Sequence, residues 1–273
     1  MVLKTEGVVA CIRNSGRVIY LTVFTPYGRL SCYASGSFGK IISKKDDLKY
    51  AMVELKLFFK NGFSEGMIRF PCEVIELKKI FSFTDDEVKR RIFRYACYLA
   101  REFSVVKSGE RFYEVLKCFH SILRKEEEIE SVKKYLFSVE LFIFASEGIT
   151  GRSFVCEHAK GFLIPVSYAV NKNLFICEDC VSNFIMREPL YLKHLSECEA
   201  RTLYEVLGRV DLTDLESSVR NVIGYLEREV DEEMFYRLLC AWDVCFSYHF
   251  FTYVHHKRGS KFFELRMAYY EKS

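Results

Sequence analysis

The chain has 273 residues, of which 50% are apolar and 16% aromatic, so it can bury a core in one large domain or in two or three small ones. Charged residues make up 28% of the sequence, which is close to the average of folded proteins and excludes a disordered chain. The most apolar stretch, 135–145, is far shorter than the ~20 residues of a bilayer span, and no signal-peptide pattern is present, so we expect a soluble protein without membrane association.

Residues 1–80 consist of short runs in which apolar and polar residues alternate, separated by turn residues such as Gly16 and Pro26. Such runs are typical of antiparallel strands. Their even spacing, with glycine in the turns, predicts a small closed or nearly closed barrel. The predicted strands are Val2–Cys11, Val18–Thr25, Arg29–Ala34, Met52–Phe59 and Met67–Leu77.

The same eighty residues carry the surplus positive charge of the chain. They contain 13 Lys and Arg against 7 Asp and Glu, whereas residues 81–273 contain 27 against 30. A basic β-module joined to a slightly acidic remainder is typical of a nucleic-acid-binding head on a scaffold.

From Thr84 onward the apolar residues recur at helical spacing. Thr84, followed three residues later by Glu87, predicts a capping box at the start of the first helix. Residues 151–181 interrupt this pattern with glycine, proline and asparagine, and we expect a hairpin-like insertion there. The predicted helices are Val88–Phe103, Arg111–Leu123, Ile129–Ser146, Glu197–Leu207, Asp214–Glu229 and Glu232–Tyr253.

The sequence therefore predicts an α+β protein with four parts. A β-barrel at 1–80 binds nucleic acid, and helices at 81–150 begin a helical body. A small insertion at 151–181 interrupts this body, which then continues over 182–273.

Basic and aromatic residues interleave along the predicted barrel. A barrel of this kind binds single strands when cations hold the phosphates and bases stack on aromatic rings, each stack contributing roughly 1–3 kcal/mol. The alternative interpretation is a solvated surface above core aromatics. The predicted contacts are Lys4, Arg13, Arg17, Arg29, Tyr33, Phe38, Lys40, Lys44, Lys45 and Lys49.

Arg90, Arg94 and Arg101 fall at helical spacing on one side of the first predicted helix. Such a face is usually solvated. If the helix lies beside the barrel, Arg90 and Arg94 would extend the contact with phosphates, or the face would bind an acidic peptide.

A candidate metal site lies in the insertion. Cys177 and Cys180 form a C-x-x-C half-site, which places two thiolates ~3.7 Å apart on one zinc ion. A second C-x-x-C is incomplete because Ala159 stands where a cysteine is needed, but Cys156 and His158 can supply the other two ligands. The alternative is a loop with free thiols and ordinary packing.

The sequence lacks the phosphate-binding loop, the dinucleotide-binding glycine motif and the G-x-S-x-G nucleophile motif, so it favours a binding protein over a catalyst. Its eleven cysteines, an odd number, stand in apolar surroundings such as those of Cys97 and Cys240. Cysteines of this kind are typical of reduced, buried thiols in a cytoplasmic protein.

The order of these segments resembles that of the RecO DNA repair and recombination mediator proteins. The resemblance covers the whole chain in order and is strongest over 1–60 and 137–181. In the C-terminal part, the cysteine-bearing insertion falls where that family has its zinc ribbon. The segments that carry the resemblance are Val2–Val9, Thr22–Ser31, Ala34–Lys45, Phe137–Gly148 and the insertion that ends at Cys180.

The resemblance implies an N-terminal OB fold, a helical body and a zinc-finger-like insertion, in a nucleoid-associated bacterial protein. It also implies a non-catalytic function in recombinational DNA repair. Such a protein binds single- and double-stranded DNA, anneals complementary strands, and acts with RecR to help RecA displace single-strand-binding protein.

Two other interpretations remain open from the sequence. The barrel and helices of a protein-interaction adaptor would bind other proteins, and the basic residues would serve only solubility. A divergent metal-dependent nucleic-acid enzyme would cleave DNA with magnesium or manganese, although acidic runs such as Glu126–Glu128 look like helix surface.

Overall fold

The chain has a mixed α+β structure with two compact units, Met1–Val132 and Lys133–Ser273. The boundary between the units lies inside the predicted part 81–150, so the first two helices belong to the unit that contains the barrel. The computed structural model describes residues 1–16, 18–36, 39, 42, 48–60, 72–104, 109–151, 153–154, 156–162, 166–185, 192–253, 264 and 266–271.

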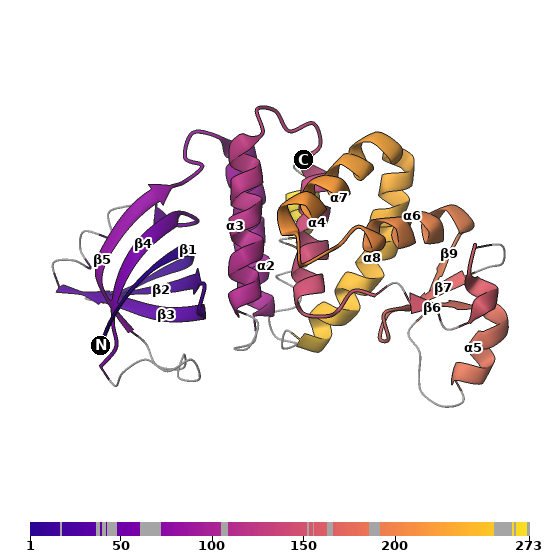
Figure 1. Ribbon diagram of the computed structural model, residues 1–273, viewed down its shortest axis with the longest axis horizontal. Helices are drawn as coiled ribbons and strands as arrows, with labels where there is room; N and C mark the ends of the chain where they lie inside the picture. The colour runs from indigo at the N-terminus through magenta and orange to yellow at the C-terminus, as the bar shows by residue number, and fades with distance from the viewer. Residues whose placement is uncertain are drawn as a thin grey trace. The chain divides into compact units, whose positions relative to one another are not determined.

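The first unit contains a closed five-stranded barrel with the strand order β1-β2-β3-β5-β4, in which β4 pairs back with β1 (Figure 1). Neighbouring strands are antiparallel except β3 and β5, which are parallel. The strands are β1 (Val2–Ser15), β2 (Val18–Thr25), β3 (Gly28–Ser35), β4 (Met52–Phe58) and β5 (Cys72–Phe81).

The strands form because their apolar residues alternate with polar ones, which places one set of side chains inside the barrel. In β2 the inward residues are Ile19, Leu21 and Val23, and all three belong to the buried core of the barrel. Their neighbours Tyr20 and Thr22 therefore lie on the outer face. The prediction of β2 is confirmed at both ends.

The predicted ends of β3 and β4 differ from the structure by one residue, and those of β1 and β5 by four or more. β1 continues past Cys11 to Ser15, because a bulge between Val9 and Cys11 lets the strand bend and pair on with β2. β5 runs to Phe81 rather than Leu77, because its polar end pairs with β4, where Glu54 is the partner of Lys78. Residues 61–71 lie outside the described part of the chain.

The described part of the first unit also contains the helices α2 (Glu87–Phe103) and α3 (Gly109–Lys125). The predicted capping box at Thr84 was wrong, because the cap of α2 is Asp86, whose side chain accepts a hydrogen bond from the N–H of Lys89. α3 packs against the barrel, with the rings of Phe24 and Phe112 6.1 Å apart.

The second unit combines helices with a four-stranded sheet of order β6-β8-β7-β9. The strand β9 pairs with β7, so the insertion extends beyond its predicted end at residue 181. None of the described helices combines the length and apolar composition that a bilayer-spanning segment requires. The elements are α4 (Val132–Ser146), β6 (Ser153–Phe154), the 3-10 turn η2 (Glu157–Ala159), β7 (Val166–Ala169), β8 (Leu174–Cys177), α5 (Glu178–Ile185), β9 (Leu192–Leu195), α6 (Glu197–Gly208), α7 (Leu215–Glu229) and α8 (Glu232–Tyr253).

A buried ion pair holds the C-terminal residues against α4 and α8. The guanidinium of Arg266 donates two hydrogen bonds to the carboxylate of Glu140, at 2.8 and 2.9 Å. Trp242 donates a third hydrogen bond to Glu140, and Asp243 accepts one from Arg266. Because both charges are buried, removing Arg266 alone would leave the carboxylate charge of Glu140 in the core without the guanidinium that compensates it.

Candidate nucleic-acid interface and metal centre

One row of residues crosses the outer face of β1, β2 and β3. In the register of these strands, Arg13 is the partner of Tyr20, and Tyr20 is the partner of Tyr33. The side chains of directly opposite residues lie roughly 4.5–5.5 Å apart at Cβ, so Tyr20 and Tyr33 are neighbours on this face and Arg13 lies next to Tyr20. Tyr20 is 46% exposed, Arg13 is exposed and Tyr33 is half-buried.

The same row continues around the barrel onto β5 and β4. Tyr33 is the partner of Glu73, Glu73 of Phe58, and Phe58 of Val2. Phe58 is 38% exposed, so a third aromatic ring reaches the surface. Glu73 accepts a hydrogen bond from the hydroxyl of Ser35 at 3.2 Å, which places one acidic group within the row.

The other end of this outer face is covered by helices. Phe24 lies on the same face as Tyr20, but it is fully buried and packs against Phe112 of α3. Among the described residues of these three strands, Arg13, Tyr20 and Tyr33 therefore lie away from the end that the helices cover.

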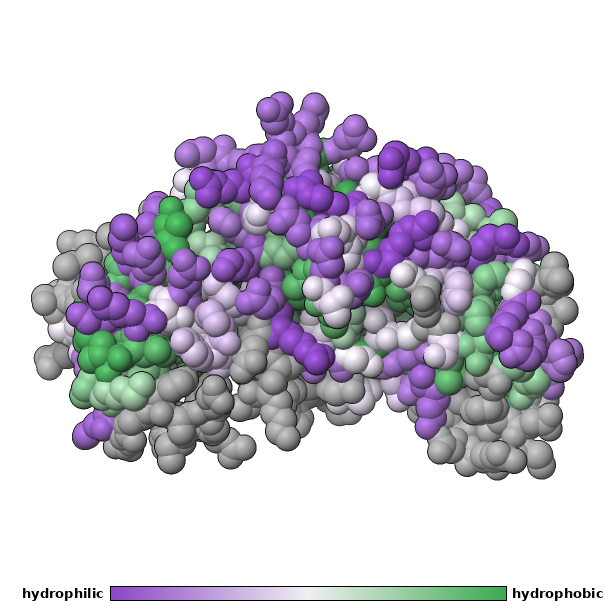
Figure 2. Space-filling view, in the orientation of Figure 1, coloured by the Kyte–Doolittle hydropathy of each residue, from purple (hydrophilic) through white to green (hydrophobic). Residues whose placement is uncertain are grey.

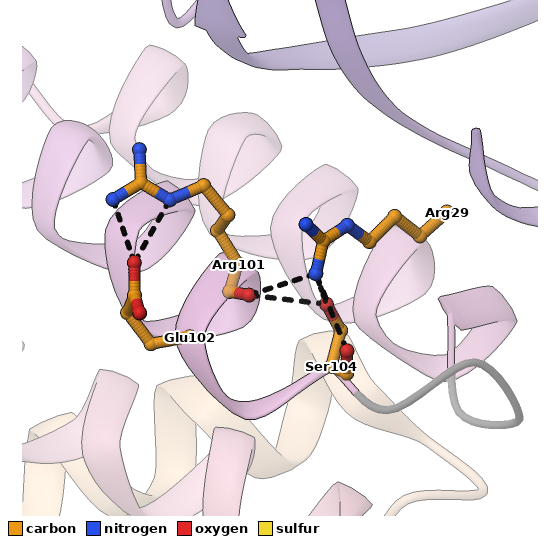
Figure 3. A network of polar contacts seen from close by, with 4 residues as sticks. All are labelled: Arg29, Arg101, Glu102 and Ser104. Carbon is orange, nitrogen blue, oxygen red and sulfur yellow. Dashed lines mark hydrogen bonds and ion pairs between the residues drawn. The ribbon is translucent and has the colours of Figure 1, made fainter. Parts of the chain in front are cut away.

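Arg29 lies at the covered end, in contact with α2 (Figure 3). Its Nη1 donates hydrogen bonds to the backbone oxygens of Arg101 and Ser104, and to the hydroxyl of Ser104 at 2.9 Å. Burial, and then the charge of Arg101, lower the pKa of Arg29. The guanidinium group thus joins β3 to the end of α2, and a nucleic-acid contact at Arg29 stays a prediction.

A second group of predicted contacts gathers around Tyr50, beside the start of α2. Lys49 Nζ lies 5.1 Å and Arg94 Cζ 5.9 Å from the centre of the Tyr50 ring. Lys49, Tyr50 and Arg90 also line a cavity of about 220 Å³. Arg90 forms an ion pair with Glu87, so part of its charge is compensated.

The outer face over β1, β4 and β5 carries charges of both signs. Lys4 lies beside two cross-strand ion pairs, in which Lys56 is 3.9 Å from Glu76 and Lys78 is 3.7 Å from Glu54. Among the described residues, the predicted cations thus lie in separate places and do not form one continuous path for a nucleic-acid backbone.

The surface over the barrel also mixes apolar and polar side chains, as Figure 2 shows for one face. The exposed apolar residues of the barrel include Val2, Tyr20, Phe58 and Ile75. The remaining predicted contacts, Arg17, Phe38, Lys40, Lys44 and Lys45, lie outside the described part of the chain.

In the second unit, the four predicted metal ligands come together. The ligand atoms of Cys156, His158, Cys177 and Cys180 all lie within 4.8 Å of one another. The Sγ atoms of Cys156 and Cys177 are 3.4 Å apart, and Cys180 Sγ is 3.8 Å from His158 Nδ1. Ligands of a tetrahedral zinc ion would be separated by roughly 3.5–3.8 Å. The cluster therefore has the donor atoms and the spacing to hold a metal ion.

Local structure explains how Cys156 and His158, which are separated by a single residue, can both contribute a ligand atom to the cluster. Cys156 precedes η2 and His158 lies within it, so the tight turn of this short helix directs both side chains to the same point. On the other side, Cys177 ends β8 and Cys180 lies in the first turn of α5.

The cluster also favours a thiolate at Cys156. Burial raises the pKa of this thiol, but hydrogen bonds from the N–H groups of Cys177 and Ala159 and from neighbouring thiols outweigh it, so the pKa is lowered. Hydrogen bonds to Cys177 and Cys156 raise the pKa of Cys180 to about 12. Because metal ions bind thiolates, the binding of a metal ion to the cluster would release protons from the cysteine thiols.

An aromatic cluster supports the small sheet that carries these ligands. The rings of Phe154, Phe162 and Phe175 contact one another, with centroids 5.5 to 6.1 Å apart, and each also contacts Tyr204 of α6. These ring contacts anchor the sheet that carries the four candidate ligands to α6.

Tyr20 and Phe58 are absent from the predicted contacts. For Tyr20 a signal exists, because the alternation of β2 places it on the same face as Thr22, opposite the apolar residues. Its position beside Arg13 and Tyr33 depends on the strand register, which the sequence does not reveal.

Neither a comparison with models of known protein families nor a search of curated proteins found a match for this chain.

Proposed function

We propose that this protein is a non-catalytic nucleic-acid-binding protein that holds single strands on the row formed by Arg13, Tyr20 and Tyr33. The observation that carries this proposal is their cross-strand alignment on the open part of the barrel face. Stacking a base on such a ring contributes roughly 1–3 kcal/mol and does not depend on sequence. An arginine beside the rings adds a phosphate contact, which weakens as salt rises.

We assign the barrel to the OB type. Its five strands close with β4 between β5 and β1, and this order supports the assignment because OB folds are five-stranded Greek-key barrels. OB folds bind oligonucleotides on a face of the barrel, and the exposed aromatic residues here lie on such a face.

Together with the resemblance to RecO proteins, the proposed binding of single strands supports a role as a mediator of recombinational DNA repair. In this role the protein binds single- and double-stranded DNA, anneals complementary strands, and acts with RecR to help RecA displace single-strand-binding protein. An annealing protein must bind any sequence and release it again. Stacking and phosphate contacts meet both needs.

We further propose that the metal held by Cys156, His158, Cys177 and Cys180 is one zinc ion with a structural role. Three thiolates and one imidazole form a closed donor set typical of structural zinc. Bound zinc would hold the end of β8 and the start of α5 against η2.

The proposal is tested by titrating labelled oligonucleotides with the full chain at several salt concentrations, beside an annealing assay with complementary strands. We expect binding without sequence preference, a log–log dependence on salt with a clearly negative slope, and faster annealing. A protein-interaction adaptor would give no binding, and a metal-dependent enzyme would cleave the strand when magnesium or manganese is added. Either result would contradict the proposal.

A further inference from the structure

The barrel closes at one short parallel seam between β3 and β5. The described residues form two register pairs there, Cys32 with Cys72 and Tyr33 with Glu73, whereas each of the other four seams has seven or more. Among the described strands of the barrel, β3 and β5 therefore share the fewest register pairs, and their first pair consists of two cysteines.

The two thiols are in direct contact inside the barrel. Their Sγ atoms are 3.4 Å apart, and both residues are 1% exposed within the core cluster. Adjacent strands place opposite Cα atoms about 4.8 Å apart, which lies within the roughly 4.4–6.8 Å range found across disulfides. A disulfide bond is about 2.05 Å long, so small side-chain rotations are enough to form it.

We propose that Cys32 and Cys72 form a peroxide-oxidisable pair, whose disulfide closes the barrel covalently at this seam. This inference does not depend on the proposed nucleic-acid binding. In the first step the sulfur of Cys72 attacks one oxygen of hydrogen peroxide, which gives a sulfenic acid and one water once the hydroxide is protonated. The sulfur of Cys32 then attacks the sulfenic sulfur, and a second water leaves. Two thiols are oxidised and one peroxide is reduced to two waters.

The environment also selects which sulfur reacts first. The contact with Cys32 lowers the pKa of Cys72, while the contact with Cys72 and burial raise the pKa of Cys32. Cys72 is thus the first to ionise, and the thiolate is the nucleophile in peroxide reactions. A small uncharged oxidant reaches the pair when the short seam opens transiently.

Cys97 provides a matched control within the same unit. It is fully buried in α2, and burial raises its pKa. We therefore expect Cys97 to remain a thiol under conditions that oxidise Cys32 and Cys72.

The test treats the full chain with hydrogen peroxide, blocks the remaining thiols with N-ethylmaleimide under denaturing conditions, and maps the peptides by mass spectrometry. We expect a linked peptide pair containing Cys32 and Cys72, about 2 Da lighter than the two reduced peptides together, which dithiothreitol separates. The substitution Cys97→Ser should leave the link in place. Cys32→Ser should abolish it and leave Cys72 as a sulfenic acid that dimedone traps.

A measurement on the unsubstituted chain keeps the test decisive even if Cys32→Ser does not fold. The peroxide-treated protein should unfold at a higher urea concentration than the reduced protein, and dithiothreitol should reverse this shift. Recovery of both cysteines as alkylated thiols after oxidation, with an unchanged urea midpoint, would overturn the proposal.

Discussion

Arg29 Nη1, in β3, lies 2.9 Å from the hydroxyl of Ser104, the residue that follows the last turn of α2. The same nitrogen lies 3.0 Å from the carbonyl oxygen of Arg101. The last carbonyl groups of a helix lack partners within the helix and carry partial negative charge. One arginine of the barrel therefore binds the C-terminal end of α2 and fixes the helix to the barrel.

The substitution Arg29→Ala should lower the free energy of unfolding of the first unit by about 1–3 kcal/mol, because part-buried acceptors lose a charged donor. Urea denaturation followed by circular dichroism measures this change. Arg90→Ala is the matched control, since Arg90 is exposed and its ion pair with Glu87 should contribute less than about 1 kcal/mol. Weaker binding of single strands by Arg29→Ala with unchanged stability would instead identify Arg29 as a nucleic-acid contact.

His120 makes the stability of the first unit depend on pH. Its ring lies 5.0 to 5.3 Å from the rings of Phe81, Phe83 and Phe93. Burial, and then the charge of Arg124, lower its pKa to about 4. The pKa of histidine is about 6.5 in an unfolded chain, so protonation favours unfolding. The contribution of neutral His120 is complete above pH ~6.5 and is lost as the pH falls towards 4.

We therefore expect the protonation of His120 to lower the free energy of unfolding by up to about 1.4 kcal/mol per pH unit as the pH falls from 6.5 to 4. His120→Phe should remove this part of the pH dependence. The measurement is urea denaturation of both proteins at pH 7, 6 and 5. If the two proteins differ in free energy of unfolding by the same amount at all three pH values, His120 does not titrate as described.

Helices and the ligand cluster could largely be predicted from the sequence, because their signals are local. The helix Glu232–Tyr253 has the predicted bounds, and the C-x-x-C spacing identified half of the candidate metal site. Contacts that depend on strand register could not be predicted. The pairing of Lys78 with Glu54 extends β5, and the alignment of Tyr20 with Tyr33 builds the aromatic row.

The function of Arg29 could not be predicted either. In the sequence it is a cation beside a turn of the barrel, which is equally compatible with a phosphate contact. Only the packing of α2 and α3 against the barrel shows that Arg29 lies at the covered end, next to Ser104.

The metal cluster should bind one zinc ion per chain, measured by elemental analysis of protein purified without chelator. Replacing His158 with Ala or Cys180 with Ser should lower the zinc content and destabilise the second unit, because ligands and folding are coupled. Cys198→Ser is the matched control, since Cys198 is exposed and lies outside the cluster. A full zinc content in both ligand variants would contradict the assignment.

Glu73 places a negative charge inside the aromatic row, where it repels phosphate. Glu73→Gln should tighten binding of single strands about two- to fivefold at low salt, and the gain should shrink as salt screens the charge. Glu54→Gln changes the net charge equally, but Glu54 lies four residues from Phe58 along β4, roughly 13 Å away. An equal gain in both variants would indicate a general charge effect and no ligand at the row.

The measurement that tests the central claim most directly is the affinity for a labelled single strand after replacing both Tyr20 and Tyr33. Alanine at both positions should weaken binding at least tenfold, because two stacking surfaces are lost. Phenylalanine at both positions keeps the rings, so this variant should retain most of the affinity. Tyr236→Ala, which removes a ring that is 68% exposed on α8, should have no effect. A folded double alanine variant that binds within twofold of the unsubstituted protein would contradict the account.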